Sequence, residues 1–232
     1  MEKSEPGIFM IGISSPSGGG KTTVTRKVVE LLEKSAAIYF DDYDYNTIHP
    51  EDFKKWLDEG ADCNAWKMPR FRDDLRRLKA GEAITSPVDG SQICPQAYIV
   101  IEAPLGYEHA ETAEYIDFMV FIDTPLDVAM ARRLLRDFPL KSSGDPREVA
   151  EGLRAELAGY LEIGRRAYLE MDNRVKPGCD LVLDGCLPVD ELGRKIVEAI
   201  RASVRRSESA TVEPKDPLHK VLDKPPSSSY RC

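Results

Sequence analysis

The segment of residues 15–23 has the composition of a loop that binds phosphate groups. It reads Ser-Pro-Ser-Gly-Gly-Gly-Lys-Thr-Thr and lies between an apolar run, residues 8–14, and a predicted helix that begins at Lys21. Glycines let the chain curl closely around phosphate oxygens, and backbone N–H groups at a helix N-terminus attract negative charge. Lysine can contact the terminal phosphates, and the hydroxyl of Thr22 can bind Mg²⁺. The segment therefore predicts a polyphosphate site.

The usual pattern of such a loop is G-x-x-x-x-G-K-[ST], and this chain carries Ser15 at its first glycine position. Ser15 either adopts the required conformation with modest strain or the loop is slightly altered. A glycine-rich turn without a ligand is the alternative, but strand, loop, Lys-Thr and helix all fall in register. The expected nucleotide-binding residues of the loop are Ser17, Gly18, Gly19, Gly20, Lys21, Thr22 and Thr23.

Carboxylates follow two other predicted strands. Asp41 and Asp42 come after the strand at 36–40, and Glu102 ends the strand at 97–102. Ligands of parallel sheets bind outside the carboxyl ends of the strands. Phosphoryl transfer needs a group that orients and deprotonates the acceptor hydroxyl and a carboxylate that holds Mg²⁺. Asp41 suits the first role and Glu102 the second, although an aspartate after a strand also commonly caps a turn.

A basic helix follows the strand at 118–123. It carries Arg132, Arg133 and Arg136, and residues 138–146 after it are rich in turn formers. Arg133 and Arg136 share a helix face. Such a helix with its loop can close over phosphates as a lid, expected at about 137–147, where the arginines neutralise charge and water is excluded. A solvated basic face is the alternative.

Apolar runs that alternate with helical patterns predict the α/β class. We expect a three-layer α/β/α fold with a five-stranded parallel sheet, because strands that are apolar throughout need cover on both faces. The expected strands span 8–14, 36–40, 97–102, 118–123 and 180–184, and the expected helices span 21–34, 50–60, 72–80, 125–137, 146–171 and 189–204. One domain at 1–204 and a flexible Pro- and Ser-rich tail at 205–232 complete the prediction.

The composition is that of an acidic globular protein. The chain has 232 residues and a formal net charge of −8, which argues against non-specific binding of nucleic acid. Apolar runs of 18 residues, a secretory leader and CxxC pairs are missing from the sequence. We therefore expect a cytoplasmic protein with reduced cysteines, a small-molecule partner and no membrane or nucleic-acid partner, and we leave a homodimer open.

In this order of motifs the chain resembles the group of P-loop kinases that contains uridine kinase, nicotinamide riboside kinase and phosphoribulokinase. The resemblance covers roughly residues 8–186 and is carried by IGISSPSGGGKTTV, FDDYDY, HPEDF, LRRLKAGEAITSPV, YIVIEAPLG, IDTPLDVAMARRLLRD and VKPGCDLVLDG. It implies transfer of the ATP γ-phosphate, with Mg²⁺, to a hydroxyl, typically of a nucleoside. By similarity Asp41 is the catalytic aspartate, Thr22 is the magnesium ligand, Glu102 is the metal-associated acid, and Arg133 and Arg136 are the lid arginines.

We accordingly expect Asp41, Lys21 and Arg133 to be catalytic, and Asp41, Tyr43, Arg70 and Glu102 to contact the acceptor. Tyr45 and Trp66 are further candidates for the acceptor pocket because they also follow the second strand. Residues 88–93 depart from the family, since of the residues that recognise a pyrimidine in uridine kinases Asp89 alone matches. The acceptor is therefore a nucleoside, a sugar or another small alcohol. A nucleotide-binding regulatory ATPase and a catalytically degenerate kinase fold are the competing hypotheses.

Overall fold

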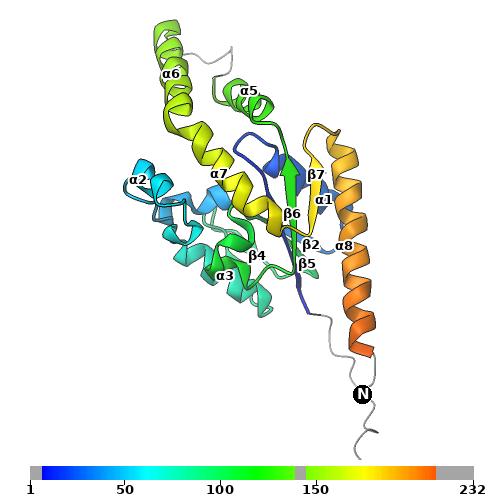
Figure 1. The fold of residues 1–232 in the computed structure, drawn as a ribbon. Coiled ribbons are helices and arrows are strands. Elements are labelled where there is room, and N and C mark those ends of the chain that lie inside the picture. Colours follow the sequence, from blue (N-terminus) through cyan, green and yellow to red (C-terminus); the bar gives the residue numbers. More distant parts are fainter. Residues whose placement is uncertain (1–6, 139–144, 213–232) are drawn as a thin grey trace, which may run out of the picture.

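The computed structural model describes residues 7–138 and 145–212. Its main feature is a parallel sheet with the strand order β2-β5-β1-β6-β7 (Figure 1). The strands are β1 (Phe9–Ser14), β2 (Ser35–Ile38), β5 (Tyr98–Glu102), β6 (Phe118–Asp123) and β7 (Leu181–Asp184). The predicted α/β class and the five-stranded parallel sheet are confirmed.

Helices connect these strands and flank the sheet (Figure 1). They are α1 (Lys21–Leu31), α2 (Phe53–Asp58), α3 (Pro69–Lys79), α4 (Ala110–Ala113), α5 (Leu126–Asp137), α6 (Pro146–Gly159), α7 (Arg165–Val175) and α8 (Val189–Val212). Short 3₁₀- or π-helical segments are η1 (Phe40–Asn46), η2 (Cys63–Ala65), η3 (Gly106–Glu108), η4 (Tyr160–Gly164) and η5 (Lys176–Gly178). A separate antiparallel hairpin pairs β3 (Ile84–Thr85) with β4 (Gln92–Ile93).

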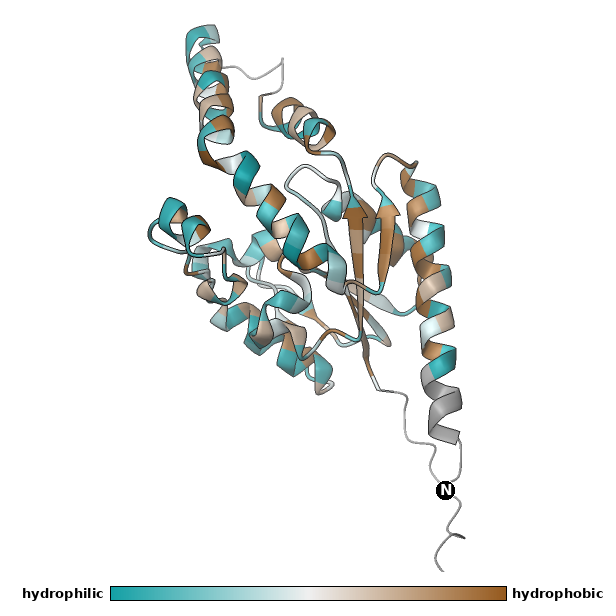
Figure 2. Ribbon diagram, viewed as in Figure 1, coloured by the Kyte–Doolittle hydropathy of each residue, from teal (hydrophilic) through white to brown (hydrophobic). Residues whose placement is uncertain are grey.

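Alternate residues of the central strand pack into opposite layers. Met10 belongs to the cluster that contains Leu75 of α3, whereas Ile11 belongs to the cluster that contains Val28 of α1 and Ile196 of α8. The side chains of a strand alternate between the two faces, so both faces of this sheet are buried. Figure 2 shows the hydrophobic strands between more hydrophilic helices. The fold therefore has the expected three layers.

The register of the sheet places the end of β1 beside Glu102, the last residue of β5. Ile13 of β1 lies opposite Glu102 of β5, and β1 ends one residue later at Ser14. The loop that follows β1 therefore begins beside the Glu102 carboxylate. Because the strands are parallel, the loops after β2 and β6 open on the same edge of the sheet.

Two expected elements end earlier than the sequence pattern predicts. The helix expected at 21–34 ends at Leu31, because Lys34 takes a left-handed conformation with a φ of 55° and Ser35 already begins β2. The strand expected at 36–40 ends at Ile38. The chain then winds into the turn η1, which carries Asp41. This turn, and not a strand end, sets the direction of the Asp41 side chain.

The two longest helical predictions also differ from the structure. The helix expected at 146–171 is divided into α6 and α7 by the π-helical turn η4, which follows Gly159 and ends at Gly164. The final helix, expected to end at residue 204, continues to Val212. No proline or glycine interrupts the chain before Pro214, and the arginine, glutamate and alanine of this stretch favour a helix.

Two predicted segments fall largely outside the described part of the chain. Residues 139–144, which form most of the expected lid, and residues 213–232 of the expected tail are not among the described residues. The domain boundary and the lid therefore stay predictions. Within residues 7–138 and 145–212, no helix is both long and apolar enough to cross a membrane.

Candidate active site

The phosphate-binding loop takes its sharp turns at glycines. Gly18 and Gly20 have φ angles of 82° and 104°, in the left-handed region that glycine adopts without cost. Ser15 has no such angle, so its Cβ causes no backbone strain. Its hydroxyl donates to the Pro16 carbonyl at 3.1 Å. The serine at the first motif position is therefore compatible with the loop.

The loop is held against the elements around it. The Thr124 hydroxyl, just after β6, donates to the Gly19 carbonyl at 2.8 Å. A Cβ built on Gly18 would lie 2.2 Å from the Ala129 carbonyl oxygen of α5. Gly18 is thus needed both for its backbone angle and for the close approach of α5. The loop's shape is fixed by packing before any ligand binds.

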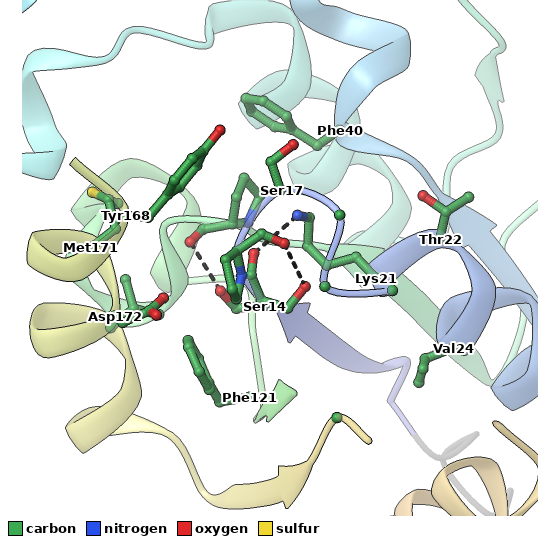
Figure 3. Close-up of a pocket in the computed structure, with 18 of the residues that line it drawn as sticks. Ser14, Ser17, Lys21, Thr22, Val24, Phe40, Phe121, Tyr168, Met171 and Asp172 are labelled. Carbon is green, nitrogen blue, oxygen red and sulfur yellow. Dashed lines mark hydrogen bonds between the residues drawn. The ribbon is translucent and has the colours of Figure 1, made fainter. Parts of the chain in front are cut away.

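A large cavity of about 1010 Å³ opens over this loop. All seven predicted loop residues, from Ser17 to Thr23, line it together with Asp41 and Arg136. Figure 3 shows Lys21 and Thr22 on the loop and Tyr168, Met171 and Asp172 facing it from α7. The cavity therefore joins the loop, the turn after β2 and the helix α7.

The lysine of the loop is the electrostatic centre of the cavity. Burial lowers the pKa of Lys21, and the negative charges of Glu102 and Asp41 counteract that shift. Arg136 and Asp172 act on the same ammonium group from α5 and α7. Charged residues far apart in the sequence thus converge on one position. The Lys21 ammonium donates to the Ser15 carbonyl at 3.0 Å.

Glu102 lies beneath the loop and has the properties of a metal-associated acid. Its side chain is buried, and burial raises its pKa, while hydrogen bonds from the Thr22 hydroxyl and the Phe40 N–H lower it. Its Oε1 atom has no hydrogen-bond partner among the described residues. A hydroxyl beside a carboxylate with a free buried oxygen is a donor set that suits Mg²⁺.

The two predicted lid arginines have different surroundings. Arg136 lines the cavity. Arg133 instead pairs with Glu156 of α6 and donates to the Tyr168 hydroxyl, and its guanidinium lies 5.5 Å from the centre of the Tyr168 ring. It lines a smaller hollow beside α6, not the main cavity. The structure therefore directs the Arg136 side chain to the cavity, whereas Arg133, whose Cβ lies beside Gly18 of the loop, has its guanidinium held on Glu156 and Tyr168.

Two of the residues expected to contact an acceptor lie in a buried network instead. The Tyr43 side chain is 1% exposed, packs on Phe71, and donates its hydroxyl to Asp74 at 3.0 Å. The Arg70 Nε donates to the same carboxylate at 2.9 Å. Neither residue lines the cavity. The turn η1 directs Asp41 to the cavity and Tyr43 into the core, which the order of residues alone does not reveal.

The far end of the cavity is aromatic. Phe53 and Trp56 of α2 line it with Trp66, and the Trp56 and Trp66 rings pack edge to face with centroids 6.2 Å apart. Ile163, Ala167 and Met171 pack against the same cluster. The indole N–H of Trp66 is buried without a partner among the described residues. Of this cluster, Trp66 alone is among the sequence-based candidates.

Sequence reasoning also missed the residues that α7 contributes. Tyr168 and Asp172 are four residues apart, with Met171 and Val175 on adjoining positions, and all four line the cavity. Spacing of three and four places side chains on one helix face. That pattern was the available signal, but it cannot tell which surface the face covers.

These features define the class of the protein. A P-loop kinase, an enzyme that phosphorylates a hydroxyl group, has a lysine- and threonine-bearing loop after the first strand, a buried acid beside it and a cavity at the same sheet edge, and this chain has all three. The model of the Phosphoribulokinase / Uridine kinase family matches residues 10–144, and the chain belongs to this family.

Individual relatives agree with the family. The chain is 29% identical over 164 residues to a uridine kinase of Borrelia duttonii (strain Ly), covering 66% of this chain and 79% of that protein. It is 28% identical over 195 residues to a uridine kinase of Chlamydia pneumoniae, covering 77% and 82%.

Two solved structures resemble the fold at lower identity. A possible uridine kinase from Bacillus stearothermophilus has a TM-score of 0.48 and 15% identity, covering 79% of this chain and 92% of that chain. A shikimate kinase from Acinetobacter baumannii has a TM-score of 0.40 and 19% identity, with coverages of 84% and 94%.

Proposed function

We propose that this protein is an ATP- and Mg²⁺-dependent kinase that phosphorylates a hydroxyl of a nucleoside or a related ribosyl or sugar compound. The observation that carries the proposal is the convergence of Lys21 and Asp41 at one cavity, with the buried Glu102 close enough for its charge to act on the Lys21 ammonium. The curated relatives are uridine kinases, which supports a nucleoside-like acceptor. The aromatic far end of the cavity agrees with an acceptor that has a flat or apolar part.

The loop and its lysine bind the nucleotide. Backbone N–H groups of residues 17–23 surround the terminal phosphates, and Lys21 leaves the Ser15 carbonyl to contact them. Arg136 adds positive charge from α5. Arg133 joins them only when its pair with Glu156 breaks. Fixed positive groups stabilise the charge that develops on the transferred phosphoryl group.

Thr22 and Glu102 are the residues that hold Mg²⁺. The metal supplies charge neutralisation on the phosphate oxygens. Glu102 would contribute to such a site through its buried Oε1, which has no hydrogen-bond partner among the described residues.

Asp41 is the residue that receives the proton. Its carboxylate faces the cavity, accepts a hydrogen bond from the acceptor hydroxyl and takes its proton as the oxygen attacks the γ-phosphorus. The new O–P bond forms as the bond between the γ-phosphorus and the β,γ-bridging oxygen breaks. ADP leaves with the electrons of that bond, and the proton is then released to solvent.

The test is acceptor-dependent formation of ADP with a panel of nucleosides and sugars. Asp41→Asn should keep ATP affinity and lose turnover by about 10²-fold or more, because a general base of this kind contributes roughly that factor. Asp44→Asn is the matched control, since Asp44 lies on the same turn but is exposed and does not line the cavity. ADP formation that needs no acceptor would indicate a regulatory ATPase. Nucleotide binding without any turnover would indicate a degenerate kinase fold.

A further inference from the structure

Asp172 is a carboxylate of the cavity that the proposed reaction does not use. It lies on α7 between Met171, which packs against the aromatic cluster, and Val175. Figure 3 shows its side chain directed from the helix toward the loop that carries Lys21. Its negative charge acts on the Lys21 ammonium. Asp172 thus lies between the phosphate end and the acceptor end of the cavity.

The folded chain leaves this carboxylate without a partner. No hydrogen bond or ion pair joins it to another residue in the described part of the chain, and the nearby Lys176 pairs with Asp123 instead. Burial and the negative charge of Asp123 raise the pKa of Asp172 to about 6. A half-buried carboxylate without a hydrogen bond is unfavourable for folding at neutral pH, and the charges of Lys21 and Lys176 offset only part of that cost. The position is therefore better explained by a ligand than by stability.

Because Thr22 and Glu102 are the proposed metal residues, we expect the ligand group opposite Asp172 to be a hydrogen-bond donor. A phosphate oxygen would meet a like charge there, which is repulsive. Among the described residues that line the acceptor end, on η1, α2 and α7 and at Trp66, the charged side chains are Asp41 and Asp172. The Tyr168 hydroxyl is already engaged by Arg133. An acceptor whose reacting hydroxyl lies on Asp41 therefore finds one further charged group.

We propose that Asp172 is a specificity residue that accepts a hydrogen bond from a second, non-reacting hydroxyl of the acceptor. The inference rests on the proposed kinase function and adds the residue that reads the acceptor: recognition depends on one particular non-reacting hydroxyl, and an acceptor that lacks it is a poor substrate. Buried polar groups that are left unpaired by an incomplete substrate cause strong discrimination against it.

The experiment combines variants of Asp172 with acceptors that lack single hydroxyls. The acceptors are uridine, cytidine, adenosine, guanosine and D-fructose, each with analogues that lack one non-reacting hydroxyl. The variants are Asp172→Leu, which removes both carboxylate oxygens, and Asp172→Asn, which keeps one oxygen that can accept a hydrogen bond. Glu170→Gln is the control, because Glu170 lies on the same helix but does not line the cavity.

In the wild type, loss of one particular hydroxyl should raise the acceptor KM roughly 10- to 100-fold, the range for a hydrogen bond to a charged group. For Asp172→Leu, the KM of the intact acceptor should be raised by the same factor. Removal of that hydroxyl from the acceptor should then change the KM of this variant by less than about twofold. Asp172→Asn should be intermediate, and the ATP KM should stay within about twofold in all variants. Melting temperatures confirm that each variant is folded, and Asp172→Asn carries the comparison alone if Asp172→Leu is not.

Three results would overturn the inference. Equal penalties for each missing hydroxyl in wild type and in both variants would show that Asp172 does not contact the acceptor. A changed Mg²⁺ requirement without a changed acceptor preference would assign Asp172 to the metal. Absence of acceptor-dependent ADP formation by the wild type across the panel would remove the kinase function itself, whereas the first two results leave that function intact.

Discussion

The Lys21 ammonium donates a hydrogen bond to the Ser15 carbonyl at 3.0 Å, so the two ends of the phosphate-binding loop are joined across its opening. The contact uses the backbone of Ser15 and not its side chain. It is therefore available to any residue with an ordinary φ at this position. The departure of the chain from the glycine pattern leaves the lysine's position unchanged.

Ser15→Gly should not improve nucleotide binding. The Ser15 backbone is not in the left-handed region, so glycine relieves no strain and only adds freedom to the unfolded chain. We expect a loss of about 0.5–1 kcal/mol in the free energy of unfolding and an ATP Kd within about twofold of wild type. Urea denaturation and calorimetric titration measure the two quantities. A much tighter ATP complex in the glycine variant would show that Ser15 distorts the loop.

Gly18→Ala and Gly20→Ala should differ although both glycines have positive φ. A Cβ at Gly18 would lie 2.2 Å from the Ala129 carbonyl oxygen, whereas a Cβ at Gly20 meets no atom within 4 Å. Gly20→Ala should cost about 1–2 kcal/mol for its left-handed backbone. Gly18→Ala should cost more and weaken ATP binding, because α5 or the loop must move. Equal melting temperatures of the two variants would refute the role of the α5 contact.

Glu156→Gln should strengthen ATP binding. Glu156 holds the Arg133 guanidinium on α6, and loss of the negative charge frees that group for the phosphates. We expect a severalfold lower ATP Kd, because a partly buried ion pair of this kind contributes about 1 kcal/mol. Arg133→Met combined with Glu156→Gln should abolish the gain. An unchanged Kd in Glu156→Gln would show that the pair is a fixed structural contact between α5 and α6.

Tyr43→Phe should lower stability without changing acceptor binding. The Tyr43 hydroxyl donates to the buried Asp74 carboxylate, and its loss leaves Arg70 as the remaining donor among the described contacts of that carboxylate. The expected loss is about 1.5–3 kcal/mol in the free energy of unfolding, with an unchanged acceptor KM. Tyr45→Phe, at a ring that is 67% exposed, should change neither quantity. A raised acceptor KM in Tyr43→Phe would show that Tyr43 contacts the acceptor, as the sequence predicted.

The stability of the fold should depend on pH through Asp172. Its pKa is raised to about 6 from 3.8, so the folded state binds the proton more tightly than the unfolded state does. The stability that this proton provides is present at acidic pH and is lost as the pH rises through about 6. Because Asp172 is only half-buried and solvent screens its charge, the wild type should lose about 1–2 kcal/mol between about pH 4 and pH 7 relative to Asp172→Asn, less than the pKa shift alone implies. Denaturation curves of both proteins at each pH measure the difference in their free energies of unfolding. A difference that does not change with pH would contradict the raised pKa of Asp172.

Local sequence patterns were sufficient to predict the α/β fold and the functional groups at the ends of its strands. The apolar strands, the glycine-rich loop with Lys21, and the acids Asp41 and Glu102 follow from short-range rules. A strand buried on both faces must be apolar, a tight phosphate loop needs glycines, and parallel strands end at one edge. Each of these rules depends either on residues that are close in the sequence or on the parallel arrangement of the strands.

The tertiary structure alone decided which other side chains reach the site. Tyr43 is two residues from Asp41, yet the turn η1 directs it into the core, while Asp172, far along the chain, is carried into the cavity by α7. Arg133 and Arg136 share a helix, but Glu156 of α6 draws Arg133 away. Helix periodicity defines a face but not the surface that the face covers, since that depends on contacts between residues distant in sequence.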